Sequence, residues 1–317
     1  ARDGGAGAAS HQEVSPRCGP TPLAYTLVAS PALRRLPTRP SRLVQGRIQR
    51  VLPRLFRLQG LELRSGNAAQ GLAKAFAAQQ AGESTLLIAF RHPSTRDPLV
   101  LADLFWNRIP AEAAALLQPL PRPVELRFLY DRGIPIWAGP VIGWLLQRCG
   151  GIAIHRGRLD RPALAQARAA LVQGRHALVV APEGATNNLS GEMAPLEPGV
   201  AQLAFWAADD LDKTNDRREL QLLPLGIRYS WRQQRWGALD QRLNALETHL
   251  GVEPLEEPAE DPISPRRDRL LHIGAHLMTA LEQLERLNPP EGQSLTERIE
   301  AYRRHGLATA EAHFQLK

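Results

Sequence analysis

Short apolar runs alternate with helical patterns through the middle of the chain. Runs with the length of strands cover residues 85–90, 124–130, 150–155, 176–181 and 220–229. The segments between them have the spacing or the length of helices, at residues 67–80, 97–105, 111–117, 136–149, 161–173 and 198–208. Such alternation is typical of a sheet with parallel strands. The pattern therefore predicts an α/β fold with a mixed, partly parallel sheet flanked by helices.

A basic amphipathic pattern precedes this alternation. Within residues 41–58, apolar residues fill much of one side, and arginines recur on the other at three- and four-residue steps, at Arg47, Arg50, Arg54 and Arg57. Such a helix can lie in a membrane interface, with its arginines on lipid phosphates. The sequence supports equally a helix that packs on its own domain and exposes a basic face. Pro53 is expected to bend or divide the helix.

Composition divides the chain into four parts. Residues 1–40 are rich in Gly, Ala, Ser, Pro and Arg with little periodicity, and we expect them to be disordered. The basic, membrane-surface helix at 41–60 and an α/β domain at 61–232 follow. Residues 233–317 form a C-terminal helical extension, with helices predicted at 235–250, 266–287 and 295–305. The chain begins with Ala1 instead of methionine, which leaves the natural start open.

Charge and cysteine content narrow the possible partners. The net charge of +7 suits nucleic acid, an anionic membrane or an acidic carrier protein. No nucleic-acid motif is recognised, and the basic helix lacks interleaved aromatic residues that would stack on bases, so no nucleic-acid partner is expected. Cys18 and Cys149 are the only cysteines and form neither a disulfide framework nor a zinc-ligand pattern, which favours a reducing compartment. No stretch approaches the ~18 apolar residues of a membrane-spanning helix.

The end of the first strand carries the first candidate for chemistry. His92 precedes a proline, which disfavours helical dihedrals, so the strand should end there. Asp97 precedes Pro98 and an apolar-periodic segment, the pattern of an N-cap followed by proline at the first helical position. The turn between them brings the Asp97 carboxylate back towards the His92 ring. An imidazole held by a carboxylate is the arrangement that a general base needs.

The same spacing has an ordinary explanation. Asp97 can simply cap its helix, and His92 can be a histidine of the turn without a role. A second pair with this spacing, His155 and Asp160, occurs later in the chain. Spacing alone does not distinguish the two pairs.

Two further residues stand beyond strand ends. Arg156 follows the strand at 150–155, and Glu183 follows the strand at 176–181. In parallel sheets the functional residues collect beyond the carboxyl ends of the strands. Arg156 carries a permanent charge on a planar fork that suits phosphate. Three such groups at three strand ends favour a common site.

These motifs together resemble the glycerolipid acyltransferase family, typified by lysophosphatidic acid acyltransferase. His92 and Asp97 match its His-x4-Asp motif, and residues 151–156 match its glycine-led strand that ends in arginine. Pro182-Glu183-Gly184 matches its Pro-Glu-Gly motif, and residues 222–227 match its apolar strand that contains proline. The resemblance covers about residues 60–230.

The resemblance implies transfer of an acyl group from a thioester to the hydroxyl of a lysophospholipid, most closely 1-acyl-glycerol-3-phosphate. His92 would be the general base and Asp97 would orient it, and Arg156 would hold the acceptor phosphate. Glu183 would help to position the glycerol portion. The donor would be acyl carrier protein or a coenzyme A thioester, with no metal and no other cofactor. The enzyme would be peripheral or monotopic on the cytoplasmic face of a membrane. Because residues 151–156 form the second motif, the resemblance also excludes His155 as the base.

One departure from the family pattern affects the acceptor. The family commonly follows Glu-Gly with Thr-Arg, whereas Ala185-Thr186-Asn187 stands here, so a second phosphate-binding arginine is missing. The predicted substrate-binding set is therefore Arg156, Glu183, Gly184, Thr186 and Asn187. Asn187 can donate hydrogen bonds but carries no charge. An acceptor other than a phosphate monoester, or a catalytically lapsed lipid-binding member of the fold, are the alternatives.

Overall fold

The computed structural model of the chain describes residues 33–157, 159–255 and 261–315. Its contacts divide the chain into two compact units. The described part of one unit is residues 33–157 and 159–234, and that of the other is residues 235–255 and 261–315. All the motif residues belong to the first unit, which we call the sheet domain.

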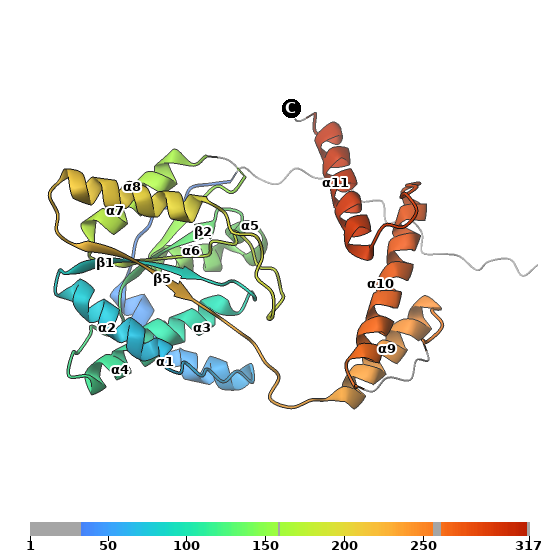
Figure 1. Cartoon of the computed structure of the whole chain (residues 1–317), viewed down its shortest axis with the longest axis horizontal. Coiled ribbons are helices and arrows are strands. Elements are labelled where there is room, and N and C mark those ends of the chain that lie inside the picture. The colour runs from blue at the N-terminus through green and yellow to red at the C-terminus, as the bar shows by residue number, and fades with distance from the viewer. Residues whose placement is uncertain (1–32, 158, 256–260, 316–317) are drawn as a thin grey trace, which may run out of the picture. The chain divides into compact units, whose positions relative to one another are not determined.

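A five-stranded sheet forms the centre of the sheet domain (Figure 1). Its strands lie in the order β3-β2-β4-β1-β5, and every pairing between them is parallel. Their bounds are β1 Ser84–Phe90, β2 Leu126–Asp131, β3 Gly151–Ile154, β4 Ala177–Val180 and β5 Glu219–Leu225. The predicted α/β fold is confirmed, and the sheet is parallel throughout where the sequence indicated a mixed one.

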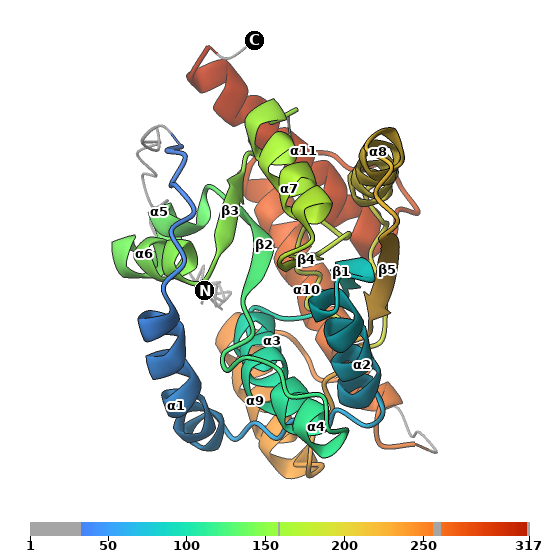
Figure 2. The same ribbon diagram turned by 90° about the vertical axis from the view of Figure 1, so that its left-hand side faces the viewer.

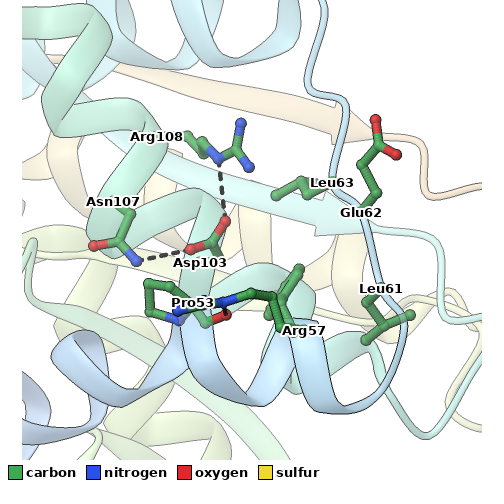
Figure 3. A pocket seen from close by; sticks show the side chains of 9 residues that line it. Pro53, Arg57, Leu61, Glu62, Leu63, Asp103, Asn107 and Arg108 are labelled. Carbon is green, nitrogen blue, oxygen red and sulfur yellow. Dashed lines mark hydrogen bonds and ion pairs between the residues drawn. The ribbon is translucent and has the colours of Figure 1, made fainter.

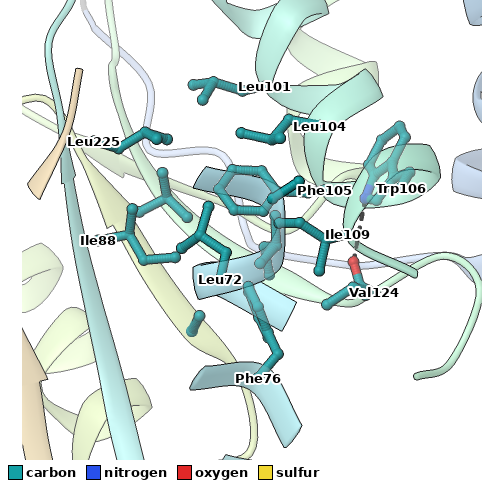
Figure 4. Close-up of a cluster of buried hydrophobic side chains, with 14 of the residues drawn as sticks. Leu72, Phe76, Ile88, Leu101, Leu104, Phe105, Trp106, Ile109, Val124 and Leu225 are labelled. Carbon is teal, nitrogen blue, oxygen red and sulfur yellow. Dashed lines mark hydrogen bonds between the residues drawn. The ribbon is translucent and has the colours of Figure 1, made fainter. Parts of the chain in front are cut away.

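Helices cover both faces of this sheet because the central strands are apolar on both sides. Alternate residues of β1 point to opposite faces: Leu86 and Ile88 enter one buried cluster, whereas Leu87 enters the other. The first cluster (Figure 4) packs against α1 Arg42–Leu58, α2 Ala68–Gln80, α3 Asp97–Asp103, the π-helical turn η1 Leu104–Arg108 and α4 Ile109–Ala115. The second packs against α7 Arg161–Gln173 and α8 Gly199–Lys213.

The strand order decides which loops meet. β1 lies between β4 and β5, so the segments that follow these three strands share one part of the carboxyl edge. They contain His92, Glu183 and Tyr229 respectively. Arg156 follows β3 at the same edge, but β2 and β4 separate β3 from β1. Three strand spacings put the ends of β1 and β3 about 14 Å apart.

The helix predicted over residues 136–149 is two helices, α5 Ile134–Ala138 and α6 Pro140–Arg148. Gly139 between them has φ = +89°, a left-handed conformation that glycine adopts without strain. Pro140 follows and has no N–H to continue the hydrogen bonds of a helix. The single-helix prediction was wrong because it treated a run of apolar residues as continuous across Gly139-Pro140.

The basic helix predicted near the start of the chain is present as α1 and continues through Pro53 without division. Its Leu52 and Phe56 are buried in the core of the sheet domain. Its four arginines at 47, 50, 54 and 57 are exposed. The predicted amphipathic pattern is therefore present: buried apolar side chains of α1 pack on the sheet domain, and its arginines face outward.

Residues 33–40, at the end of the segment predicted to be disordered, make contacts with the sheet domain. The Thr38 hydroxyl donates to the carbonyl of Gly151 (2.6 Å), and the Arg39 N–H donates to that of Gln147 (3.1 Å). This part of the prediction is corrected by those hydrogen bonds. The rest of the predicted segment, residues 1–32, lies outside the described residues.

The second unit contains three helices among its described residues, α9 Trp236–Leu250, α10 Ser264–Leu284 and α11 Leu295–His313. The helix predicted at 295–305 therefore extends further. Ion pairs with half-buried or buried partners join neighbouring helices: Arg269 binds Glu247, and Arg298 binds Glu282. Ser294 and Glu297 form a capping box at the start of α11.

Candidate active site

The His92 ring meets the Asp97 carboxylate. His92 Nδ1 lies 2.7 Å from Asp97 Oδ2, and the imidazole is 23% exposed while the carboxylate is fully buried. Because an ionised carboxylate only accepts hydrogen bonds, Nδ1 carries the proton and Nε2 is the nitrogen that can accept one. The buried Asp97 carboxylate holds the ring, and the partly exposed His92 ring can be reached by a substrate. This arrangement suits a general base.

Asp97 is held by two more donors. The Ser94 N–H donates to Oδ2 (3.1 Å), and the Tyr229 hydroxyl donates to Oδ1 (2.7 Å). Burial, together with the hydrogen bond to Asp97 and the charge of its carboxylate, raises the pKa of the Tyr229 hydroxyl, which therefore keeps its proton at neutral pH. The predicted N-cap role of Asp97 was wrong: it is the first residue of α3, and its carboxylate points back to the turn and the ring.

Glu183 is a second buried carboxylate beside His92. Its Oε1 accepts from the main-chain N–H of His92 (2.9 Å). Its Oε2 accepts from the N–H of Ala194 (2.8 Å) and from Asn187 Nδ2 (3.2 Å). Glu183 thus joins the turn that carries the base to the loop that follows β4. Because both carboxylate oxygens accept from protein donors, Glu183 holds the His92 main chain against that loop.

Asn187 is bound within the same loop. Besides its bond to Glu183, its Nδ2 donates to the carbonyl of Glu192 (2.8 Å), and its Oδ1 accepts from the N–H of Leu189 (2.9 Å). Both ends of the amide are engaged within this loop. Thr186, also predicted to bind substrate, has no side-chain hydrogen bond among the described contacts.

The glycines of two motifs are required by close contacts. Gly184 has φ = +68°, and a Cβ there would lie 3.0 Å from Glu197 Oε1. A Cβ at Gly151 would lie 2.8 Å from the carbonyl oxygen of Leu146 and from the ring of Tyr130. Gly151 therefore allows α6 to approach β3, and Gly184 allows the chain to turn beside Glu183.

Three residues at the site have no counterpart in the sequence prediction. Arg91 donates to the carbonyls of Leu189 (2.6 Å), Ser190 (2.5 Å) and Glu192. The Ser190 hydroxyl donates to the Tyr229 carbonyl (2.7 Å) and accepts from its N–H (2.6 Å). Arg91 adjoins His92, a signal that the sequence did contain. Nothing near Ser190 or Tyr229 in the sequence indicates their contacts, which are made by residues far along the chain.

Arg156 stands apart from the dyad. Its guanidinium is about half exposed and lies 3.7 Å from Asp131 Oδ2. It shares the carboxyl edge of the sheet with His92 across the three strand spacings given above. The structure thus brings His92, Asp97 and Glu183 together and leaves Arg156 at the far end of the edge, with its charge open to solvent.

The second pair with the same spacing has another geometry. Asp160 accepts from the main-chain N–H of His155 (2.9 Å), not from its ring, and it caps α7 through the N–H of Ala163 (3.2 Å). Asp160 also forms an ion pair with Arg132. His155 Nδ1 lies 2.8 Å from the Arg156 carbonyl. His155 and Asp160 are therefore structural residues.

A pocket of about 440 Å³ opens beside α1 and η1 (Figure 3). Asp103 on its wall accepts from Asn107 Nδ2 (2.7 Å) and from Arg108 Nε (3.1 Å), and the rest of the wall is largely apolar. Neither His92 nor Asp97 lines this pocket.

Comparison with known families gives one match. The model of the family described as Acyltransferase matches residues 73–227, a range that contains His92, Asp97, Arg156 and Glu183. No curated protein matches the chain. Within the described residues, no helix has the length and hydropathy of a membrane span.

Proposed function

Since residues 73–227 form a domain of the acyltransferase family, we propose that this chain acylates a lysophospholipid, most closely 1-acyl-glycerol-3-phosphate, with an acyl thioester as donor. The product from that acceptor is phosphatidic acid. The observation that carries the proposal is the 2.7 Å contact between His92 Nδ1 and Asp97 Oδ2, which leaves Nε2 as a base at the carboxyl edge of the sheet.

His92 takes the proton of the acceptor hydroxyl while the oxygen attacks the thioester carbonyl. The tetrahedral intermediate then collapses, the C–S bond breaks, and the imidazolium returns the proton to the departing thiolate. Asp97 stabilises the imidazolium by charge and by its hydrogen bond. General-base catalysis of this kind typically contributes about 10²- to 10⁴-fold. The step needs no acyl-enzyme and no metal.

Arg156 is the cation that we assign to the acceptor phosphate. Its guanidinium is half exposed, and the ~14 Å between its strand and that of His92 can be spanned by two side chains and a glycerol phosphate between them. Asn187 adds no second charge, because an amide is neutral, and this amide also binds Glu183 and Glu192. That difference supports, as a second candidate, an acceptor lysolipid with a different head group.

The donor and the location follow from the same reaction. Acyl carrier protein or coenzyme A carries the thioester, and either is an anionic partner that suits a chain with a net charge of +7. Peripheral or monotopic association with the cytoplasmic face of a membrane would bring the domain to its lipid acceptor. The exposed arginines of α1 support contact with anionic lipid.

Release of free thiol from an acyl thioester in the presence of lysophosphatidic acid tests the reaction. We expect turnover by the parent, and we expect Arg156→Ala to raise the KM for this acceptor by about tenfold or more with a smaller change in kcat, because a charged hydrogen bond contributes about 1.5–3 kcal/mol. Arg161→Ala, which removes a nearby exposed arginine at the start of α7, is the control. Turnover only on other lysolipids would establish the second candidate. Lysolipid binding without turnover on any acceptor would show a lapsed enzyme.

Tyr229→Phe tests the hydrogen bond that the Tyr229 hydroxyl donates to Asp97. The Tyr229 hydroxyl withdraws negative charge from Asp97 by its 2.7 Å hydrogen bond. Without it, the carboxylate favours the protonated imidazole more, so the acid limb of the kcat profile should move to higher pH. We expect up to about one pH unit, since one neutral hydrogen bond contributes about 0.5–1.5 kcal/mol and one unit equals about 1.4 kcal/mol.

The matched control is Tyr130→Phe. The Tyr130 hydroxyl is buried and has no hydrogen-bond partner among the described residues, so its removal should leave the pH profile unchanged. An acid limb that stays in place in Tyr229→Phe while stability falls would mean that Tyr229 is only structural.

A further inference from the structure

The helical hairpin formed by α5 and α6 has an exposed apolar surface. Gly143 is its only buried residue within residues 134–148. Trp137 is 74% exposed, Val141 67% and Trp144 45%, and Ile136 and Ile142 are exposed beside them. Most exposed apolar side chains of a protein are scattered, whereas these five come from nine consecutive positions, 136–144. We call this surface the tryptophan patch.

The hairpin is held firmly to the sheet domain although its own side chains are exposed. A Cβ at Gly143 would lie 3.0 Å from the ring of Pro135, so the two helices are in close contact. The Arg148 carbonyl accepts from the N–H of Ser41 (2.9 Å) and from Gln45 Nε2 (3.0 Å), which ties the end of α6 to the start of α1. The patch is therefore presented on a fixed scaffold, and no described element covers it.

The charges in and beside the patch are mainly positive. Residues 133–148 contain no acidic side chain and a single cation, Arg148, whose guanidinium lies 5.7 Å from the centre of the Trp144 ring. The adjoining α1 lies on the same side of the sheet domain (Figure 2) and exposes Arg47, Arg50 and Arg54. None of these three forms an ion pair with another described residue.

The patch also lies near the candidate active site. α5 begins three residues after the end of β2, at the carboxyl edge of the sheet that also bears His92. Asp131, the last residue of β2, contacts Arg156 at 3.7 Å. A lipid that enters from the side of the patch would thus arrive first at the cation that we assign to its phosphate.

We propose that the tryptophan patch is the surface by which the sheet domain docks on a lipid bilayer. Tryptophan is enriched at the interface between hydrocarbon and water, where its apolar ring and its N–H are both satisfied. Neighbouring arginines add attraction to anionic lipid. An acidic carrier protein is a poorer fit, because the patch itself bears only one charge. The consequence for catalysis rests on the proposed function, but the docking does not.

Vesicle binding by the full chain tests the docking. Sedimentation with vesicles of phosphatidylcholine and phosphatidylglycerol should show binding by the parent. The double variant Trp137→Ala/Trp144→Ala should bind about tenfold or more weakly, since it removes the two largest apolar side chains of the patch. Trp231→Ala is the matched control: Trp231 is 93% exposed and follows β5, at the opposite edge of the sheet from β3. We expect it to bind within twofold of the parent.

Activity separates this proposal from the proposed function. The double variant should turn over a water-soluble short-chain acceptor at the rate of the parent, and should lose rate only on an acceptor embedded in vesicles. Parent binding without any turnover would overturn the proposed function alone. Equal vesicle binding by parent and double variant, with unchanged thermal unfolding, would overturn the docking proposal. The docking proposal would also be overturned if the parent did not bind vesicles and instead self-associated through the two tryptophans.

Discussion

Replacement of His92 by alanine is expected to lower kcat for acyl transfer by at least about 10²- to 10⁴-fold, the usual contribution of a general base. The KM values should change little, because the ring acts on the proton and not on the head group. Thiol release measured under saturating donor and acceptor gives the comparison. Since the imidazole is 23% exposed and packs edge-on against Phe90, its loss should leave the thermal unfolding midpoint within a few degrees of the parent.

The chain offers its own control for this variant. His155 has the same spacing to an aspartate, but its ring contacts the Arg156 carbonyl instead of the Asp160 side chain. His155→Ala should therefore keep kcat within about threefold of the parent. A His92→Ala variant with nearly full turnover would refute the general-base role, and loss of kcat in His155→Ala alone would assign that role to the other pair.

The second large effect is expected from Asp97→Asn. The exchange keeps the shape of the side chain but removes its charge, so the imidazolium that forms during the reaction loses its counter-ion. An amide that turns its NH2 towards Nδ1 would also select the wrong tautomer. For an aspartate in this arrangement, replacement by asparagine lowers kcat by up to about 10⁴-fold. We expect about 10²- to 10⁴-fold here, with little change in acceptor KM.

Asp160→Asn is the control for Asp97→Asn: it makes the same exchange in the pair whose carboxylate does not contact a histidine ring. Asparagine caps a helix about as well as aspartate, so Asp160→Asn should act mainly by removing the negative partner of Arg132. We expect it to lower the free energy of unfolding and to leave kcat within a few-fold. Denaturant titration of both variants, together with kcat, makes the comparison. If Asp97→Asn lost stability and kept its turnover, Asp97 would be a structural residue only.

Local sequence patterns were sufficient to predict most of the helices and strands of the sheet domain. The helix at Arg161–Gln173 has a proline near its start, Asp160 as its cap and Gly174 with φ = +66° after its end, and both of its bounds were predicted from the sequence. The strands were also placed to within a few residues, because apolar runs bounded by turn residues are local signals. Gly139-Pro140 is the counter-example, since this pair divides an apolar run that looks continuous.

The carboxyl edge of the sheet was predicted as the place of the site, and His92, Asp97 and Glu183 do meet there. The roles of Glu183 and Asn187 were not predictable, because a motif gives the identity of a side chain and not its hydrogen-bond partners. In the structure Glu183 binds the His92 N–H, and Asn187 binds Glu183. Asn187 stands where the family commonly has an arginine, and its hydrogen bonds join parts of the loop that follows β4.

Local sequence patterns were enough to predict the strands, most of the helices and two histidine-aspartate pairs of equal spacing. Spacing does not distinguish the two pairs, and the resemblance to the family favours His92. The contacts that make one pair a dyad, and leave the other without a contact between ring and carboxylate, appear only in the folded chain. The reason is that spacing limits which residues can reach each other across a turn, whereas the direction of a buried carboxylate depends on the donors around it. Asp97 is drawn to the ring side by the hydroxyl of Tyr229, 132 residues away on the segment after β5. Asp160 is drawn to Arg132 and to the first turn of its own helix, away from the ring of His155.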